Sequence, residues 1–252
     1  MTILINIIKR ELSSYFSTPL AYVFIVIFLA LIESLTFYVG NFFVRGQADL
    51  NSFFVFHPWV YILLIPAVTM RLWAEERKTG TIELLMTLPL STTQAVLGKF
   101  IAAWLFILVA LVLTFPIWIT VNYLGDPDNG VVFAGYIGSL FMAGAYLSIG
   151  SCISAITKNQ VIAFVIGTTV CFLFTMTGVD LVLNFFKLWA PDFLVNTISS
   201  MSFLNSFFRS SQSISLYFFA FIIRVRRLEK ASLLLILSSY IKLFIVLTIQ
   251  LL

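Results

Sequence analysis

The chain is a succession of apolar runs, each about as long as a bilayer is thick, separated by short polar stretches. A helix needs about 20 apolar residues to cross the hydrocarbon core, and only helices and closed barrels satisfy their backbone groups there. Of the 252 residues, 61% are hydrophobic and 10% are charged, whereas soluble domains are roughly half apolar and a quarter charged. We therefore predict an all-α membrane protein that crosses the bilayer several times.

The apolar runs predict six transmembrane helices. They cover residues 20–43, 53–70, 95–123, 131–156, 161–177 and 203–223. Between the last two, from Gly178 to Met201, short apolar pieces alternate with polar residues, which predicts brief re-entrant helices at the outer interface. Residues 19–252 thus form one transmembrane domain, in which 231–252 is a further apolar segment whose topology stays open.

Residues 1–18 precede the first span and have the pattern of an amphipathic helix. Leu4, Ile8, Leu12 and Tyr15 share one helical stripe, and polar residues share the opposite one. Pro19 separates this segment from the first span. We predict a helix that lies in the membrane interface.

The stretch from Arg71 to Thr93, between the second and third predicted spans, is the most polar part of the chain. Its charged residues around Gly80 are Arg71, Glu75, Glu76, Arg77, Lys78 and Glu83. Residues 81–88 then carry an apolar stripe that ends at Pro89. The stretch is too short for an enzyme domain, so it predicts a helical hairpin that either docks a partner or rests on the lipid surface.

The basic residues divide unequally between the two sides of the predicted membrane domain. One side receives Lys9, Arg10, Arg71, Arg77, Lys78, Lys99, Lys158, Arg224, Arg226, Arg227 and Lys230, and the other receives Arg45, Lys187 and Arg209. Cytoplasmic loops carry the excess of Lys and Arg, so we expect a cytoplasmic N-terminus and a cytoplasmic 71–93 loop. The net charge of +4 then reflects orientation, and we expect no nucleic-acid partner.

Two titratable residues lie inside predicted spans. Glu33 is in the outer half of the first span, where a carboxylate faces a pathway or a partner helix, or packs helices together through hydrogen bonds. His57 precedes Pro58 near the outer end of the second span, and we expect a hydrogen-bonded structural role before a proton relay. No nucleophile motif accompanies them, so we expect no catalytic residue.

Metal and cofactor chemistry finds little support in the sequence. Asp126 and Asp128 belong to an Asp-Pro-Asp-Asn-Gly turn, which is a turn signal before it is a calcium site. Cys152 and Cys171 lie inside apolar runs without neighbouring His or Cys, which suits packing thiols. We therefore expect no metal and no cofactor.

Two segments resemble the ABC-2 type exporter permeases. Residues 74–89, followed by Gly98 and Lys99, are similar to the cytoplasmic loop of that family, and so is the segment Ser154–Gln160. The layout of spans is similar from Met1 to about Ser202. The closest resemblance is to the small permeases grouped with gliding-motility-associated ABC transporters.

The resemblance implies a half-transporter of a bacterial cytoplasmic membrane, in which two permease subunits, identical or different, enclose the pathway and two separate ATPase subunits supply energy. The chain has no phosphate loop of its own, since Gly98-Lys99-Phe100 lacks the upstream glycine and the hydroxyl residue. It is therefore expected to be a transporter subunit, not an enzyme. The residues implied to contact the ATPase are Glu75, Glu76, Lys78, Thr79, Gly80, Thr81, Glu83, Leu84 and Leu85.

After about Ser202 the chain departs from the family pattern, because a Ser-rich weak span and a basic cluster precede the apolar segment 231–252. Either that segment is an extra span or interfacial helix, or the reading frame changed near Ser206, which the abrupt Ser and Leu enrichment favours. The leading function is the permease subunit of an ATP-driven exporter with unidentified substrate. The alternative is a non-transporting membrane scaffold or assembly factor derived from such a permease.

Overall fold

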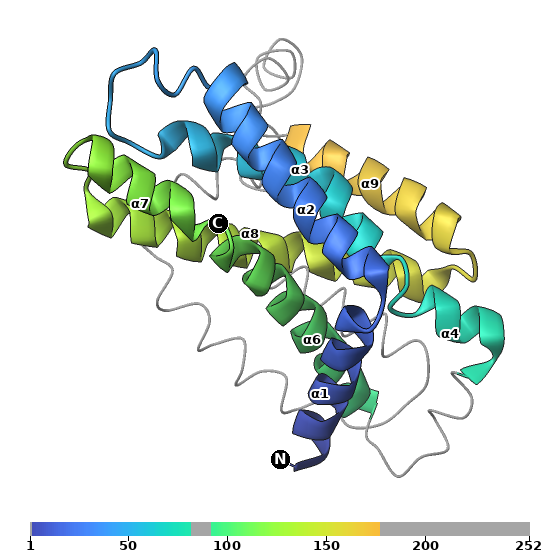
Figure 1. Ribbon diagram of the computed structural model, residues 1–252. Helices are drawn as coiled ribbons and strands as arrows, with labels where there is room; N and C mark the ends of the chain where they lie inside the picture. The colour runs from blue at the N-terminus through green and yellow to red at the C-terminus, as the bar shows by residue number, and fades with distance from the viewer. Residues whose placement is uncertain (1, 82–91, 177–252) are drawn as a thin grey trace, which may run out of the picture.

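The computed structural model describes residues 2–81 and 92–176, and helices dominate both parts (Figure 1). In chain order they are α1 (Thr2–Phe16), α2 (Pro19–Ser34), the π-helical turn η1 (Leu35–Val39), α3 (Asn51–Thr69), α4 (Ala74–Thr79), α6 (Thr92–Val112), α7 (Phe115–Leu124), α8 (Asn129–Ile156) and α9 (Gln160–Met176). No strand occurs among these residues, which confirms the all-α class for this part of the chain.

Four stretches within the described ranges are long and apolar enough to cross a membrane. They are Pro19–Val39, Asn51–Thr79, Thr93–Leu124 and Asn129–Ile156, and α9 adds a shorter apolar helix of 17 residues. The four candidates overlap the first four predicted spans and α9 overlaps the fifth, and the chain is a multi-pass membrane protein. The span count and the span boundaries stay predictions. The predicted sixth span, the re-entrant helices and the segment 231–252 lie outside the described residues.

The predicted third span, 95–123, is two helices instead of one. α6 ends at Val112 and α7 begins at Phe115. Pro116 explains the break, because proline removes a backbone donor and clashes with the carbonyl four residues earlier, yet fits the first turn of a new helix. In the turn, the Thr114 hydroxyl donates to the Leu111 carbonyl (2.6 Å).

The first span is also shorter than its predicted range, 20–43. After Ser34 the α-helix gives way to η1, and the Gly40 N–H closes a five-residue turn onto the Leu35 carbonyl (2.8 Å). Such π-helical turns are rare inside α-helices. The span-capable stretch includes η1 and ends at Val39. Apolar composition does not distinguish an α-helix from this wider turn, so the sequence pattern did not predict the change after Ser34.

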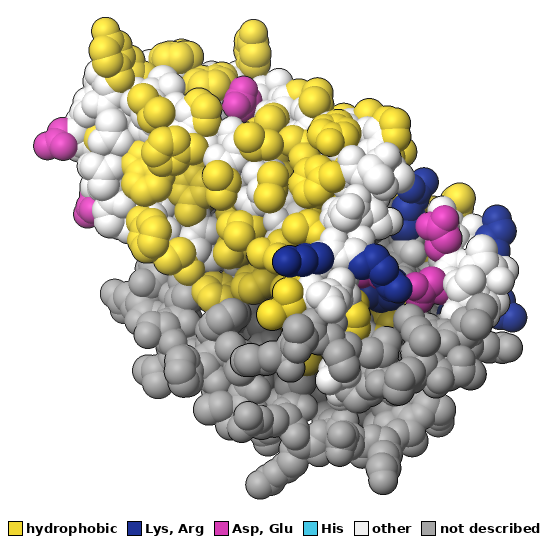
Figure 2. All heavy atoms as spheres, turned by 60° about the horizontal axis from the view of Figure 1, so that its bottom comes forward, with side chains coloured by type: hydrophobic (Ala, Val, Ile, Leu, Met, Phe, Trp, Pro, Cys, Tyr) yellow, Lys and Arg dark blue, Asp and Glu magenta, His cyan; other side chains and the backbone are white. Residues whose placement is uncertain are grey.

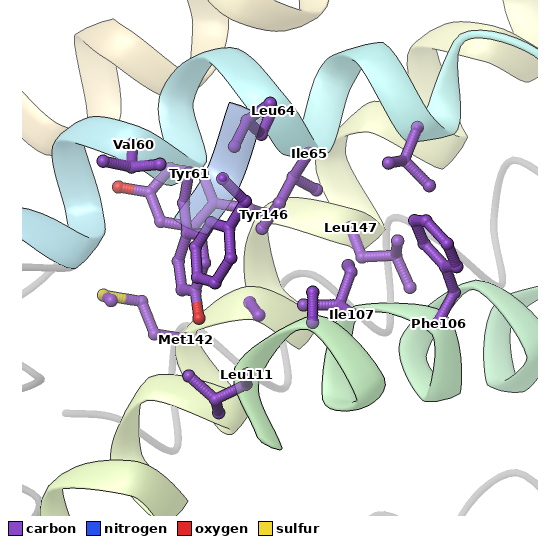
Figure 3. Packing of buried hydrophobic residues seen from close by; sticks show 14 of the residues in the cluster. Val60, Tyr61, Leu64, Ile65, Phe106, Ile107, Leu111, Met142, Tyr146 and Leu147 are labelled. Atoms are coloured by element: carbon purple, nitrogen blue, oxygen red, sulfur yellow. The ribbon is translucent and has the colours of Figure 1, made fainter. Parts of the chain in front are cut away.

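The core of the bundle lies where α3, α6 and α8 meet (Figure 3). Buried side chains of α3 (Val60, Tyr61, Leu64, Ile65), α6 (Phe106, Ile107, Leu111) and α8 (Met142, Tyr146, Leu147) point toward one another there. α8 also packs against α9, and α3 packs against α2 and α9. Buried hydroxyl pairs tie these helices together, with Tyr61 and Ser139 2.8 Å apart and Tyr146 and Thr175 2.5 Å apart.

The two ends of the bundle differ in charge (Figure 2). We call the end that carries α1, α4, the start of α6 and the end of α8 the α4 end, and the opposite end the α7 end. Lys and Arg side chains gather at the α4 end, and hydrophobic side chains cover the middle of the face shown. Seven described basic residues belong to the α4 end: Lys9, Arg10, Arg71, Arg77, Lys78, Lys99 and Lys158.

Two polar residues singled out in the sequence have structural partners. His57 was expected near an interface but is fully buried among the rings of Phe28, Phe53 and Tyr61, and its Nδ1 donates to the Phe53 carbonyl (2.9 Å). At the α7 end, Asp128 caps α8 by accepting from the N–H groups of Gly130 (2.9 Å) and Val131 (3.3 Å). Asp128 therefore shapes the turn, as helix-capping aspartates do.

Candidate functional site

The short helix α4 begins with a cap supplied by another helix. The Ser154 hydroxyl on α8 accepts hydrogen bonds from the backbone N–H groups of Trp73 and Ala74, both at 3.2 Å, and donates to the Met70 carbonyl at 3.2 Å. The first N–H groups of a helix need acceptors outside it, and the Trp73 side chain at the N-cap position makes no capping hydrogen bond. Ser154 thus fixes the start of α4 on α8.

A residue of α4 in turn caps the end of α8. The Arg77 guanidinium donates through Nη1 to the carbonyls of Ala155 (2.5 Å) and Ile156 (2.7 Å). The last carbonyls of a helix lack partners within it and carry partial negative charge, so a cation there is favourable. α4 and α8 therefore cap each other, and α4 cannot shift freely relative to the end of α8.

A buried ammonium group joins α4 to two further helices. Lys99, near the start of α6, pairs with Glu76 of α4 (Nζ–Oε1 2.8 Å) and with Glu11 of α1 (Nζ–Oε2 3.3 Å). The same Nζ lies 5.4 Å from the centre of the Trp73 ring, and the Lys99 side chain is 5% exposed. We call Glu11, Trp73, Glu76 and Lys99 the Lys99 cluster. A charge this deeply buried needs such partners.

α1 packs closely on the start of α6. A Cβ added to Gly98 would lie 2.5 Å from the Cγ2 of Ile7, and the Tyr15 ring stacks on Phe106 at 5.2 Å. Leu12 and Tyr15 of the predicted apolar stripe pack against the helical core. The interfacial position of α1 itself stays a prediction.

Electrostatics at Glu11 favour its charged form. Burial alone would raise the pKa of this carboxyl, but Lys99 and the guanidinium of Arg10, 2.7 Å away, outweigh burial and hold the pKa below its ordinary value of 4.5. Because Arg10 is largely exposed, solvent screens its share, and Lys99 is the more important partner.

The lowered pKa predicts how acid affects this part of the protein. A carboxyl with a depressed folded-state pKa contributes stability above its unfolded value, here 4.5, and loses it as the pH falls below that value. We expect the wild type to melt at a higher temperature than Glu11→Gln at pH 7, and the difference to shrink below about pH 4.5. Melting temperatures in detergent from pH 7 to 4 check this. The exposed Glu75→Gln is the matched control, and a difference that does not depend on pH would contradict the prediction.

The residues implied by the resemblance divide into three groups. Glu75, Lys78, Thr79, Gly80 and Thr81 are exposed at the α4 end, and Gly80 ends α4 with a φ of 75°, which few other residues adopt. Glu76 instead points inward to Lys99. The remaining three, Glu83, Leu84 and Leu85, lie outside the described residues.

Glu33 is far from this site. It lies in the last turn of α2, just before η1, and is half-buried. It makes no ion pair or hydrogen bond to any residue the structure describes. Its role in a pathway or in helix packing stays a prediction.

Sequence reasoning assigned no role to five residues that build the site: Glu11, Trp73, Arg77, Lys99 and Ser154. Lys99 and Ser154 lie in the two segments that carry the family resemblance, but the resemblance says nothing of their contacts. One signal was present, because Lys99 is a single charge inside an apolar run, and an intramembrane charge usually has a partner. The identity of that partner depends on contacts distant in the sequence.

Comparison with known families agrees with the resemblance. A family model described as ABC-2 family transporter protein matches residues 5–252, whereas no curated protein matches the chain. The matched residues include the segment after Ser202, so the comparison gives no support to a changed reading frame near Ser206. Because the match covers nearly the whole sequence, the chain belongs to the ABC-2 family of transporter proteins.

Proposed function

We propose that this chain is the membrane-spanning permease subunit of an ATP-binding-cassette exporter in a bacterial cytoplasmic membrane. Membership of the family implies pairing with an ABC ATPase in general. The sequence lacks a phosphate loop, so a separate subunit binds ATP, in two copies beside two permease chains. The grouping with gliding-motility permeases and the choice between a homodimer and a heterodimer stay predictions.

The two-sided character of α4 is the observation that carries the proposal. One side of α4 is fastened to α8 and α6 through Ser154, Arg77 and Glu76. The other side exposes Glu75 and Lys78, a polar surface of mixed charge. A partner bound to that surface is therefore connected to the helical bundle through α4. Nucleotide-driven closure of an ATPase pair requires such a connection, because its movement must reach the membrane helices.

The distribution of charge supports a cytoplasmic α4 end. Seven described basic residues lie at that end, whereas Arg45, which follows α2 and η1, is the one described basic residue away from it. Cytoplasmic sides of membrane proteins carry the excess of Lys and Arg. With this orientation, the N-terminus and α4 share the compartment in which ATP is available.

A charge exchange on α4 tests the proposal. We expect the double variant Glu75→Lys, Lys78→Glu to lose the partner ABC ATPase subunit during co-purification, because reversed charges at an interface oppose binding. Its melting temperature should stay near that of the wild type, since both residues are exposed. Asp126→Asn, exposed at the α7 end, is the control and should retain the ATPase. Retention by the double variant would exclude α4 as the docking surface.

The scaffold alternative predicts a different outcome in the same preparation. A scaffold would hold the ATPase but would not move with its nucleotide cycle. A permease should show different amide hydrogen exchange in α6 and α8 with ATP and vanadate than without nucleotide. Equal exchange in the two states would favour the scaffold.

A further inference from the structure

The Lys99 cluster connects three chain segments that are far apart in the sequence. Lys99 belongs to the first half of α6, Glu76 to α4 and Glu11 to α1. Lys99 and Glu11 are separated by 88 positions. Apart from the Lys99 cluster, α4 is fastened to α8 through Ser154 and Arg77, whereas α1 packs mainly on α6. Lys99 is thus the charged link between the proposed docking helix and the N-terminal helix.

The energetics of the Lys99 cluster suit a role in transmitting movement better than a role in stabilising the fold. A buried ion pair contributes little net stability compared with apolar packing, but separating its members leaves a charge without its partner, which is strongly unfavourable. If α4 moves away from α6 alone, the Glu76–Lys99 ion pair breaks and Lys99 keeps only Glu11. Either the three helices move together or the ion pairs break.

Glu76 reaches Lys99 through one of its two carboxylate oxygens. Its Oε1 pairs with Lys99, whereas its Oε2 is buried and has no hydrogen-bond partner among the described residues. Buried polar atoms in native proteins are nearly always bonded. Among the described residues, Lys99 is therefore the one partner of this carboxylate, and displacement of α4 acts on Lys99 through a single ion pair.

We propose that Lys99 is a positioning residue that passes displacement of α4 to α1 and to the start of the third span, through its ion pairs with Glu76 and Glu11. This inference rests on the proposed function, since it assumes that an ATPase subunit moves α4. It assigns distinct roles to the two carboxylates. Glu76 receives the movement from α4, and Glu11 passes it on to α1.

Nucleotide-dependent hydrogen exchange of the permease–ATPase complex in lipid nanodiscs tests this inference. In the wild type we expect exchange in 74–81, in α6 and in α1 to differ between the vanadate-trapped and nucleotide-free states. Lys99→Met keeps an apolar chain of similar length against Trp73 but removes the charge. It should retain the difference in 74–81 and lose it in α1. A purely structural defect would raise exchange in both states and leave the difference unchanged.

Two isosteric variants test the two ion pairs of Lys99 separately. They also replace Lys99→Met in the test if that variant does not fold. Glu76→Gln should lose the nucleotide-dependent difference in α6 and α1, whereas Glu11→Gln should lose it in α1 alone. Lys9→Met, exposed on α1, is the control and should behave as the wild type. If α1 still responds in Lys99→Met or in Glu76→Gln, the Lys99 link is overturned. If 74–81 does not respond in the wild type, the proposed function itself fails.

Discussion

Replacing Ser154 with alanine is expected to loosen α4 from α8 and to lower the melting temperature of the purified protein. The hydroxyl accepts from the N–H groups of Trp73 and Ala74 and donates to the Met70 carbonyl, and Ser154 and Ala74 are fully buried. Removing the partner of a buried polar group costs about 1–3 kcal/mol. In a chain of this size, each kcal/mol corresponds to roughly 2–4 °C in melting temperature.

The neighbouring Ser151 provides the matched control. It is also fully buried on α8, but its hydroxyl donates only to the Leu147 carbonyl (2.6 Å) of the same helix. Ser151→Ala removes a donor within one helix and leaves the contact between α4 and α8 intact, so its melting temperature should change less. Equal loss in both variants would mean that the Ser154 hydroxyl does not hold α4. Reduced ATPase co-purification with Ser154→Ala alone would link the cap to docking.

Local pattern was sufficient for the helices whose ends are marked by polar turns. The predicted fourth span, 131–156, agrees with α8 because the Asp126–Gly130 turn and the Thr157–Gln160 turn both interrupt apolar sequence. The third span, 95–123, was predicted in the right place, but the break inside it was not predicted. Around Thr114 and Pro116 the composition stays apolar, so the break between α6 and α7 follows from proline geometry, to which hydropathy is insensitive.

The candidate site shows a different limit of sequence reasoning. Charge density around Gly80 predicted a docking surface in the α4 region, and Glu75 and Lys78 are exposed there. The docking itself stays a prediction. Whether a charged residue faces outward or inward depends on distant partners. Glu76 turns inward because Lys99 lies beside it, and Ser154 reaches Trp73 across 81 positions. No periodicity within α4 encodes those pairings.

The family resemblance covers segments that the structure brings together. The segments quoted for it contain Glu76, Lys99 and Ser154, and the structure brings them to one end of the bundle. A motif read along the sequence indicates which segments belong to a family. The contacts among these residues show how the segments are joined. α4 is attached to the bundle by the Ser154 hydroxyl, by its own Arg77 guanidinium and by the Lys99 ammonium group.

The second large effect is expected where α8 crosses α3. Gly150 faces Thr69 so closely that an added Cβ would overlap the threonine hydroxyl and lie 2.9 Å from its Cβ. Thr69 is 1% exposed and belongs to the last turn of α3. Gly150→Ala therefore forces the two helices apart, and overpacking of this kind costs about 1–3 kcal/mol. We expect a lower melting temperature and, because Ser154 is one turn further along α8, weaker attachment of α4.

A size exchange across the crossing shows whether contact with Thr69 causes the loss. Thr69→Ala removes the hydroxyl and the methyl group and costs only a local bond to the Pro66 carbonyl (3.2 Å). In the double variant the remaining conflict is with the Thr69 Cβ alone, so we expect partial recovery of the melting temperature. Gly144→Ala is the control, since its added Cβ would lie 3.3 Å from the Trp104 ring nitrogen, a much milder contact than the one at Gly150. Two results would contradict the idea that Gly150 permits the close approach of α3 and α8. One is a wild-type melting temperature for Gly150→Ala, and the other is a double variant that melts no higher than Gly150→Ala. Additive losses in the two single variants would point to the same conclusion, because residues in direct contact are expected to be coupled.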